Sequence, residues 1–316
     1  MVRFIADNFR ERHIPCDALF LDIHYMDGYR IFTWDKSRFP DPPRLLADLR
    51  RQGFRVVTII DPGVKVDPNY WVYQQGVAGD DFVKMLDGRT FVGKVWPGEA
   101  VFPDFTWGRV SNWWGSLYRG LIRDGVAGFW NDMNEPSVFD VPDKTMPPEA
   151  VFFDHGLHSP HAKVHNVYGM LMSEATRQDI LKYRPNERPL VITRDTFAGG
   201  QRYAAVWTGD NSSTWEHLRL SLPELMNMGL SGLALVGTDI GGFALSPSPT
   251  FSRAGWKSAS PTPTAAPTRN SAAAIRSRGH MATCARRSIG MPSNCATACC
   301  LTSTTRSMRR LRRDCR

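Results

Sequence analysis

The sequence predicts an α/β protein built around a (β/α)8 barrel of the TIM type that is incomplete, with about six of the eight strands recognisable. Three observations lead to this fold class. Segments with helical periodicity alternate with short apolar runs, which is typical of parallel strands joined by crossover helices. The runs are almost continuously apolar, as expected for strands covered on both faces. A charged residue follows each of six runs.

The expected elements follow one another regularly from the N-terminus. Residues 2–9 repeat apolar and charged positions with a helical period, which predicts an amphipathic first helix. Further helices are expected at 43–53, 110–125, 164–183 and 213–229. Gly53 ends the first of these, and Pro223 is expected to kink the last. Apolar and β-branched residues predict strands at 18–23, 54–60, 126–130, 189–193, 204–207 and 233–237.

The charged residues at the carboxyl ends of the predicted strands are Asp22, Asp61, Asp132, Arg194, Asp210 and Asp239. In a closed barrel all strands deliver such groups to one rim, where the active site lies. An open doubly wound sheet binds ligands mainly at one switch point. Charges at all six ends therefore favour the barrel, although two strands are not recognisable.

The chain divides into a partial catalytic domain at 1–249 and a basic low-complexity tail at 250–316. Within the domain, the segments 62–105 and 136–162 are too long for ordinary connections, and we expect elaborated loops there. The tail lacks periodicity and is rich in Ser, Thr, Ala, Pro and Arg, so we expect it to be disordered. It is either an acquired tail or the product of a shifted reading frame. The abrupt change of composition favours the frameshift, which translation of the other two frames of the coding DNA would test.

The charge of the chain does not indicate a nucleic-acid partner. The formal net charge is +8, but residues 251–316 alone contain twelve Arg, one Lys and one Asp, so the preceding domain is mildly acidic. Nucleic-acid binding through the tail is the weakest functional alternative. No apolar run is long enough for a membrane span, and we expect no membrane partner. The sequence leaves the oligomeric state open.

Cysteine and histidine usage predicts neither disulfides nor a metal site. Cys16 is the one cysteine before residue 250, which fits a reducing compartment. The N-terminus has no secretory leader pattern, and we expect a cytoplasmic location. Histidines at positions 155, 158, 161 and 165 are expected on surface loops, without the ordered partners of a metal site. No metal and no cofactor are expected.

Acidic residues surrounded by Trp96, Trp130 and Trp207 indicate a sugar site, because indole faces stack on pyranose rings. A retaining glycosidase uses two carboxyl groups about 5–5.5 Å apart, one as nucleophile and one as general acid/base. The residues alone leave both Asp132 and Glu135 as possible nucleophiles. Asp132 is favoured, because Pro136 restricts the backbone of Glu135, which we expect to brace the loop.

Six motifs in order resemble glycoside hydrolase family 31, the α-glucosidases and their relatives, over residues 2–249. They are "LDIHYMDGYRIFTWD" (21–35), "IIDPGVK" (59–65), "GKVWPGEAVFPDFT" (93–106), "GFWNDMNEPSVF" (128–139), "ITRDTFAGGQRYAAVWTGDN" (192–211) and "GTDIGGF" (237–243). The resemblance implies cleavage of terminal α-glucosidic bonds in gluco-oligosaccharides by double displacement. No cofactor takes part in that two-carboxylate chemistry.

The resemblance also implies a role for each matching residue. Asp132 matches the nucleophile and Asp210 the general acid/base. Asp22 matches a carboxylate that binds sugar hydroxyls, and Arg194 matches a cation beside the nucleophile. The residues that match the lining of the same subsite are Ile23, Ile59, Trp96, Trp130, Met133, Trp207, Asp239 and Phe243.

The sequence departs from the family pattern at both ends. A β-sandwich and a first barrel strand precede this point in the family, and a last strand with a substrate-binding histidine follows Phe243; neither is visible here. An incomplete barrel exposes apolar edges, so we expect the isolated chain to be unstable or inactive. The enzymatic alternatives are an α-xylosidase or a transglucosidase of the same family. The non-enzymatic alternative is an inactive relative that binds sugar.

Overall fold

The structure is a computed structural model that describes residues 1–245. The tail predicted at 250–316, with its proposed frameshift, lies outside the described residues. The chain forms two compact units. What we call the terminal unit contains Met1–Asp22, Leu45–Val57 and the described residues from Ala205 onward. What we call the central unit contains Ile23–Arg44 and Thr58–Ala204.

All six predicted strands are present, each of them shorter than predicted. They are β1 (Ala18–Leu21), β2 (Arg55–Ile60), β6 (Gly128–Asn131), β9 (Val191–Thr193), β10 (Ala205–Trp207) and β11 (Val236–Gly237). Their order in the sheet, β1-β2-β6-β9-β10-β11, is their order in the chain. The pairs β6–β9 and β10–β11 are parallel. This topology is that of a partial (β/α)8 barrel, as predicted.

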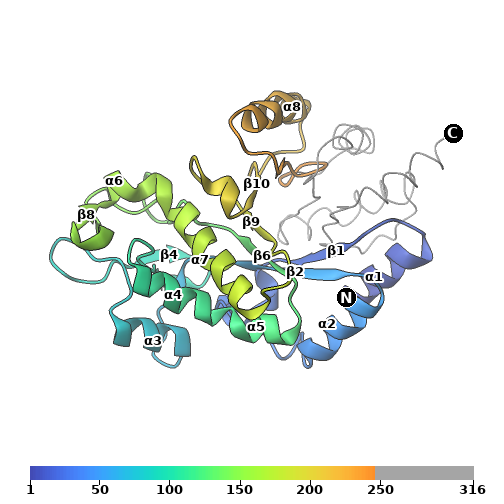
Figure 1. Ribbon diagram of the computed structural model, residues 1–316, viewed down its shortest axis with the longest axis horizontal. Helices are drawn as coiled ribbons and strands as arrows, with labels where there is room; N and C mark the ends of the chain where they lie inside the picture. The colour runs from blue at the N-terminus through green and yellow to red at the C-terminus, as the bar shows by residue number, and fades with distance from the viewer. Residues whose placement is uncertain (246–316) are drawn as a thin grey trace. The chain divides into compact units, whose positions relative to one another are not determined.

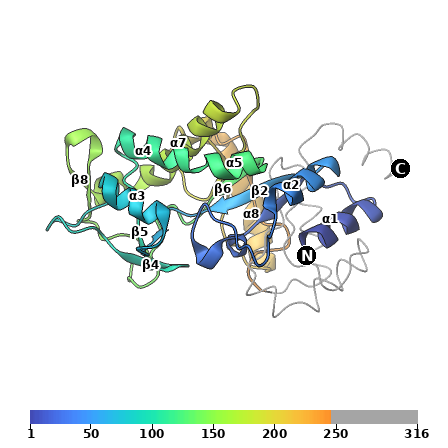
Figure 2. The ribbon, with the colours of Figure 1, turned by 90° about the horizontal axis from the view of Figure 1, so that it is seen from below.

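Three helices of the central unit pack together beside β6 and β9. They are α4 (Gly108–Leu117), α5 (Arg119–Asp124) and α7 (Tyr168–Tyr183). Both α4 and α5 contact α7, and the three lie side by side in both views (Figure 1, Figure 2). The single helix predicted over 110–125 is divided at Tyr118. Gly115 permits the close approach of α4 to α7, because a Cβ there would collide with the carboxylate of Asp179.

Tyr118 stands at the centre of a buried aromatic cluster in the central unit. Its ring meets Phe129 edge-on at 4.6 Å and Phe32 at 4.9 Å between centroids. Its hydroxyl accepts hydrogen bonds from Asn131 Nδ2 at 3.2 Å and from Thr176 Oγ1 at 2.9 Å. Asn131 is the last residue of β6, so this buried contact fixes the strand end at which Asp132 follows.

The two segments expected to be elaborated loops carry short elements of their own. Residues 62–105 contain β3 (Val64–Lys65), α3 (Trp71–Gly79), β4 (Gly93–Val95) and β5 (Gly98–Val101). The three strands form an antiparallel sheet in the order β3-β5-β4, with α3 nearby (Figure 2). Residues 136–162 include the antiparallel pair β7 (Val151–Phe152) and β8 (Ser159–Pro160) and the start of α6 (His161–Val164).

One histidine was expected on the surface and is buried instead. His161 stacks on Phe152 at 5.7 Å between ring centroids, and its Nδ1 lies 3.0 Å from the carbonyl of Met146. Burial, followed by the charge of His165, lowers the pKa of His161 to about 4. The ring is therefore a neutral core group at ordinary pH.

The terminal unit contributes α1 (Val2–Glu11), most of α2 (Pro42–Arg51) and α8 (Trp215–Leu230). Thr214 caps α8 by accepting a hydrogen bond from the His217 N–H, and Pro223 lies inside this helix. The guanidinium of Arg10 covers the ring of Phe54 at 3.7 Å from its centroid. Short 3-10 turns complete the described chain at Ile23–Tyr25, Asp27–Tyr29, Asp154–Gly156, His165–Val167 and Gly200–Arg202.

Candidate active site

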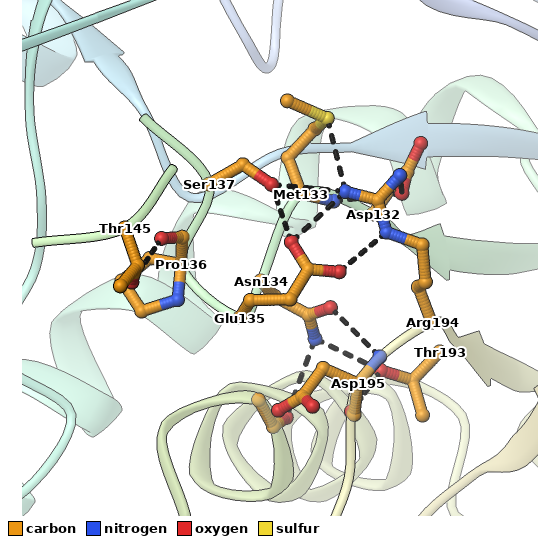
Figure 3. A network of polar contacts seen from close by, with 11 residues as sticks. Asp132, Met133, Asn134, Glu135, Pro136, Ser137, Thr145, Thr193, Arg194 and Asp195 are labelled. Carbon is orange, nitrogen blue, oxygen red and sulfur yellow. Dashed lines mark hydrogen bonds and ion pairs between the residues drawn. The ribbon is translucent and has the colours of Figure 1, made fainter. Parts of the chain in front are cut away.

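Asp132 and Arg194 follow two neighbouring parallel strands at equivalent positions. In the register of β6 and β9, Asn131 is paired with Thr193, so the next residue of each strand leaves the sheet at the same edge. The Arg194 N–H donates to the Asn131 carbonyl at 3.1 Å, and the Asp132 N–H donates to the Ile60 carbonyl at 3.2 Å. The side chains meet there, with Arg194 Nη1 at 3.1 Å from Asp132 Oδ1 (Figure 3).

Met133 holds Asp132 in place through an uncommon backbone conformation. Its φ is 56°, in the left-handed region that non-glycine residues seldom adopt. In this conformation the Met133 N–H donates to Asp132 Oδ1 at 2.7 Å, and its Sδ lies 3.2 Å from Arg194 Nη2. Residues held in such sparsely populated conformations cluster at functional sites.

Glu135 pairs with the guanidinium of Arg194 through two hydrogen bonds, on an edge that Asp132 does not contact. Arg194 Nε donates to Glu135 Oε1, and Nη2 donates to Oε2 at 2.9 Å (Figure 3). Ser137 Oγ donates to the same Oε2 and accepts from Arg194 Nη2 at 3.0 Å. Burial on its own would raise the pKa of Glu135, but the hydrogen bonds and charge of Arg194 outweigh it and hold that pKa below its usual range.

Asn134 ties the loop after β6 to the loop after β9. Its Nδ2 donates to Thr193 Oγ1 at 2.8 Å, and its Oδ1 accepts from the Asp195 N–H at 3.2 Å. Gly169 of α7 allows the helix to lie directly against both loops. A Cβ at this position would lie only 2.7 Å from the Asp195 carbonyl oxygen and 2.8 Å from that of Asn134. Asn134 and α7 therefore hold in register the two loops that present Asp132 and Arg194.

Sequence reasoning missed the part that Glu135, Ser137, Asn134 and Asp195 take in this network. Glu135 was expected to brace the loop, and the structure shows that it also pairs with Arg194, which lies 59 residues further along the chain. One signal was available. A second carboxylate lies three residues after Asp132, next to the predicted rim that also receives a lone arginine.

Asp195 is a half-buried residue beside this network, and its Oδ2 atom is buried. Burial and then the negative charge of Glu135 raise the pKa of Asp195 to about 7, against the smaller opposing effect of Arg194. In the unfolded chain the same group titrates near 3.8. The folded state thus holds a proton on Asp195 that the unfolded state releases at lower pH.

Asp195→Asn is expected to stabilise the protein, and to stabilise it more at pH 8 than at pH 5. The wild type loses the stabilisation from its bound proton as the pH rises from about 4 to about 7, whereas asparagine stays neutral throughout. Thermal melts of both proteins at pH 5, 6, 7 and 8 would measure the growing difference in Tm. Exposed Asp143 offers the control Asp143→Asn, for which the difference should not grow. A constant difference for Asp195→Asn would contradict the expectation.

The other predicted residues of the central unit are Ile23, Ile59, Trp96 and Trp130. Ile23, Ile59 and Trp130 are buried. Trp96 is 41 % exposed and meets Phe139 edge-on at 5.1 Å between ring centroids. Lys94, two residues before Trp96, accepts at its carbonyl a hydrogen bond from the Phe139 N–H. The hairpin that carries Trp96 is therefore attached to the loop that carries Asp132.

The terminal unit holds the remaining predicted residues at the ends of β1, β10 and β11. Trp207 and Asp239 are buried, whereas Asp210 is exposed. Asn211 joins two of the loops, because its Nδ2 donates to the Asp239 carbonyl at 3.1 Å and its carbonyl accepts from the Phe243 N–H at 2.8 Å. Asp22 follows β1 and is half-buried. The approach of Asp210 to Asp132 stays a prediction.

Among the described residues, no group of three or more His, Cys, Asp and Glu side chains is arranged to hold a metal ion. None of the helices formed by residues 1–245 combines the length and the apolar character needed to cross a membrane.

Comparison with known proteins identifies relatives over most of the chain. The model of the glycosyl hydrolases family 31 TIM-barrel domain matches residues 1–261. Alpha-glucosidase 2 of Bacillus thermoamyloliquefaciens is 52% identical over 243 residues, which are 77% of this chain and 31% of that protein. The chain therefore spans about a third of the length of this curated relative.

Solved structures of similar proteins share the fold. The ER glucosidase II complex of a catalytic subunit with the binding domain of a regulatory subunit superposes with a TM-score of 0.80 at 37% identity, over 85% of this chain and 29% of that one. The family 31 alpha-glucosidase from Bacteroides thetaiotaomicron superposes with a TM-score of 0.75 at 47% identity, over 85% of this chain and 43% of that one.

Proposed function

Because this chain belongs to glycosyl hydrolase family 31, we propose that it supplies the catalytic barrel residues of a retaining α-glucosidase. The substrate is an α-linked gluco-oligosaccharide, cleaved at its terminal glucosidic bond. The observation that carries the proposal is the pairing of Asp132 with Arg194 directly beyond β6 and β9. A guanidinium at this distance favours the ionised carboxylate, which is the form that a nucleophile needs.

In the proposed reaction, a carboxylate oxygen of Asp132 attacks the anomeric carbon of the terminal glucose. Asp210 gives its proton to the glycosidic oxygen, the leaving alcohol departs, and a covalent glucosyl-enzyme ester forms. Asp210 then takes a proton from water, the hydroxide oxygen attacks the same carbon, and the Asp132 carboxylate is released. The two inversions return glucose in the α configuration. This mechanism requires carboxyl oxygens about 5–5.5 Å apart.

The remaining predicted residues have supporting roles in this proposal. Trp130 and Trp207 provide aromatic faces for the sugar ring, and Asp22 and Asp239 accept hydrogen bonds from its hydroxyls. Ile23, Ile59, Met133 and Phe243 complete an apolar lining, with Trp96 at a more exposed position. The relatives named alpha-glucosidase support glucose as the sugar.

The test is hydrolysis of 4-nitrophenyl α-glucoside by the full chain, with the 4-nitrophenyl α-xyloside and an added sugar acceptor as parallel arms. The open edges of the incomplete barrel predict an unstable or inactive chain; if the chain does turn over, glucose should be the main product, and NMR spectra taken in the first minutes should show the α anomer before mutarotation. Faster cleavage of the xyloside, or a disaccharide as main product, would replace the proposal with the xylosidase or transglucosidase alternative. A chain that melts cooperatively yet cleaves none of these substrates would refute it.

A further inference from the structure

The side chain of Arg194 is held along two of its edges and presents a third atom to Asp132. Nε and Nη2 donate to the two carboxylate oxygens of Glu135, and Nη1 lies 3.1 Å from Asp132 Oδ1. The side chains of Arg194, Asp132 and Glu135 are 18%, 12% and 30% exposed, so water screens these contacts only in part. Such two-point pairing of a guanidinium with a carboxylate is directional as well as strong.

Because the guanidinium is planar, its pairing with Glu135 also fixes the position of Nη1. The three nitrogens are fixed in one plane, so a carboxylate that holds Nε and Nη2 also determines where Nη1 points. A lysine in the same place would offer a point charge without this orientation. Glu135 therefore determines the direction from which the cation meets Asp132.

Ser137 fixes Glu135 in turn. Its Oγ donates to Glu135 Oε2 and accepts from Arg194 Nη2, so it closes a small ring of hydrogen bonds (Figure 3). Ser137 itself is anchored through its N–H, which donates to the Met133 carbonyl at 2.9 Å. Met133, Glu135 and Ser137 belong to the loop after β6, so the loop that carries Asp132 also carries the support for the partner of Asp132.

We propose that Glu135 is a positioning residue, which orients the guanidinium of Arg194 so that Nη1 holds the Asp132 carboxylate ready for attack. The proposal rests on the proposed function, in which Asp132 is the nucleophile. Glu135 touches neither the sugar nor the reacting atoms in this scheme. It acts through Arg194, and Ser137 assists it.

Two effects of Glu135 on Asp132 have opposite signs, which makes the proposal testable. As a bare negative charge, Glu135 disfavours the ionised form of Asp132, so its removal would move the acidic limb of kcat/KM to lower pH. As a positioning residue, Glu135 keeps the cation in place, so its removal moves that limb to higher pH. Asp195 is a further titratable group near Glu135, and its side chain is the same in all variants.

The first experiment needs no activity. Phenylglyoxal modifies accessible arginines, and peptide mass spectrometry gives the rate at Arg194 relative to exposed Arg89 within the same chain. We expect Arg194 to react at least about tenfold more slowly than Arg89 in the wild type. Its side chain is 18% exposed against 83% for Arg89, and its hydrogen bonds to a charged partner are each worth about 1.5–3 kcal/mol. Glu135→Gln should remove most of this protection, since the amide nitrogen opposes a guanidinium N–H.

The second experiment measures pH profiles of 4-nitrophenyl α-glucoside hydrolysis. We expect Glu135→Gln to lower kcat/KM about 10- to 100-fold, the equivalent of one lost charged hydrogen bond, and to move the acidic limb upward. Ser137→Ala leaves every charge unchanged and should give a smaller shift in the same direction. The matched control is Asp81→Asn, which removes the buried carboxylate of another guanidinium pair, that of Arg109. It should leave the limb where it is.

Each outcome decides the proposal. Equal labelling of Arg194 and Arg89 in the wild type would show that the pairing does not form, and unchanged protection in Glu135→Gln would show that Glu135 does not provide it; either result overturns the proposal. A downward limb shift would assign Glu135 a purely electrostatic effect and also overturn it. If the wild type hydrolyses no glucoside, the proposed function fails, and the labelling experiment still decides whether Glu135 positions Arg194.

Discussion

Asp132→Ala is expected to reduce hydrolysis of an aryl α-glucoside by about 10⁴-fold or more, a loss typical of removing a covalent nucleophile. The remaining activity would come from sugar binding and from Asp210. The substitution deletes the Nη1 contact of Arg194 but leaves its two-point pairing with Glu135. We therefore expect the variant to keep its fold, and a thermal melt would verify this.

Addition of azide to the Asp132→Ala variant tests this assignment through a product that only the missing nucleophile would allow. In the Asp132→Ala variant, azide can occupy the space of the missing carboxylate and attack the anomeric carbon. The product should be a β-glucosyl azide, because only one inversion takes place. The control is Glu135→Ala with azide, which should give no glucosyl azide since Glu135 is not the attacking group. Formation of the azide by the Glu135 variant would mean that the nucleophile is misassigned.

Arg194→Met is expected to lower both activity and stability. It leaves the carboxylates of Asp132 and Glu135 facing a side chain without charge, in surroundings that are mostly buried. Loss of one partner from a buried pair costs about 3–5 kcal/mol, and the partial exposure here reduces our expectation to about 2–3 kcal/mol. In a domain of this size each kcal/mol lowers Tm by about 2–4 °C. We expect kcat/KM to fall about 10²- to 10³-fold, as on loss of a preorganised charge.

The matched controls for Arg194→Met are Arg194→Lys and Arg109→Met. Lysine keeps the charge but cannot pair with Glu135 and Asp132 in one plane, so it should restore most of the stability and only part of kcat/KM. Arg109 pairs with buried Asp81 and is itself 43% exposed, so its loss should lower Tm less and leave kcat/KM unchanged. An Arg194→Met protein with wild-type Tm and turnover would contradict the geometry described here.

The elements of the barrel were predictable because their signals are local. Runs such as "FRVVTII" (54–60) and "PLVIT" (189–193) show their strand character in five to seven consecutive residues. Their charged ends follow from parallel strands and one shared rim. The break between α4 and α5 at Tyr118 was not predicted, because the apolar pattern continues across it. The sheet β3-β5-β4 was missed for a similar reason, since its strands contain only two to four residues.

Sequence reasoning placed Asp132 and Arg194 at the ends of strands but did not find the group that joins them. The two-point pairing of Glu135 with Arg194 links positions 59 residues apart. This pairing depends on the register that sets Asn131 opposite Thr193. A shift of one residue in that register would turn the side chains to opposite faces. His161 is a comparable case, because its burial against Phe152 and Met146 follows from how the loop folds back on itself.

The sequence by itself determined the class of fold, the order of the elements and the kinds of group that each strand delivers, because periodicity and composition are properties of neighbouring residues. Tertiary structure alone decided which of these groups touch. Strand register placed Arg194 beside Asp132, the approach of α7 at Gly169 held the loops together, and Glu135 became the partner of a distant arginine. Such contacts depend on distances in space, which the order of residues along the chain does not specify.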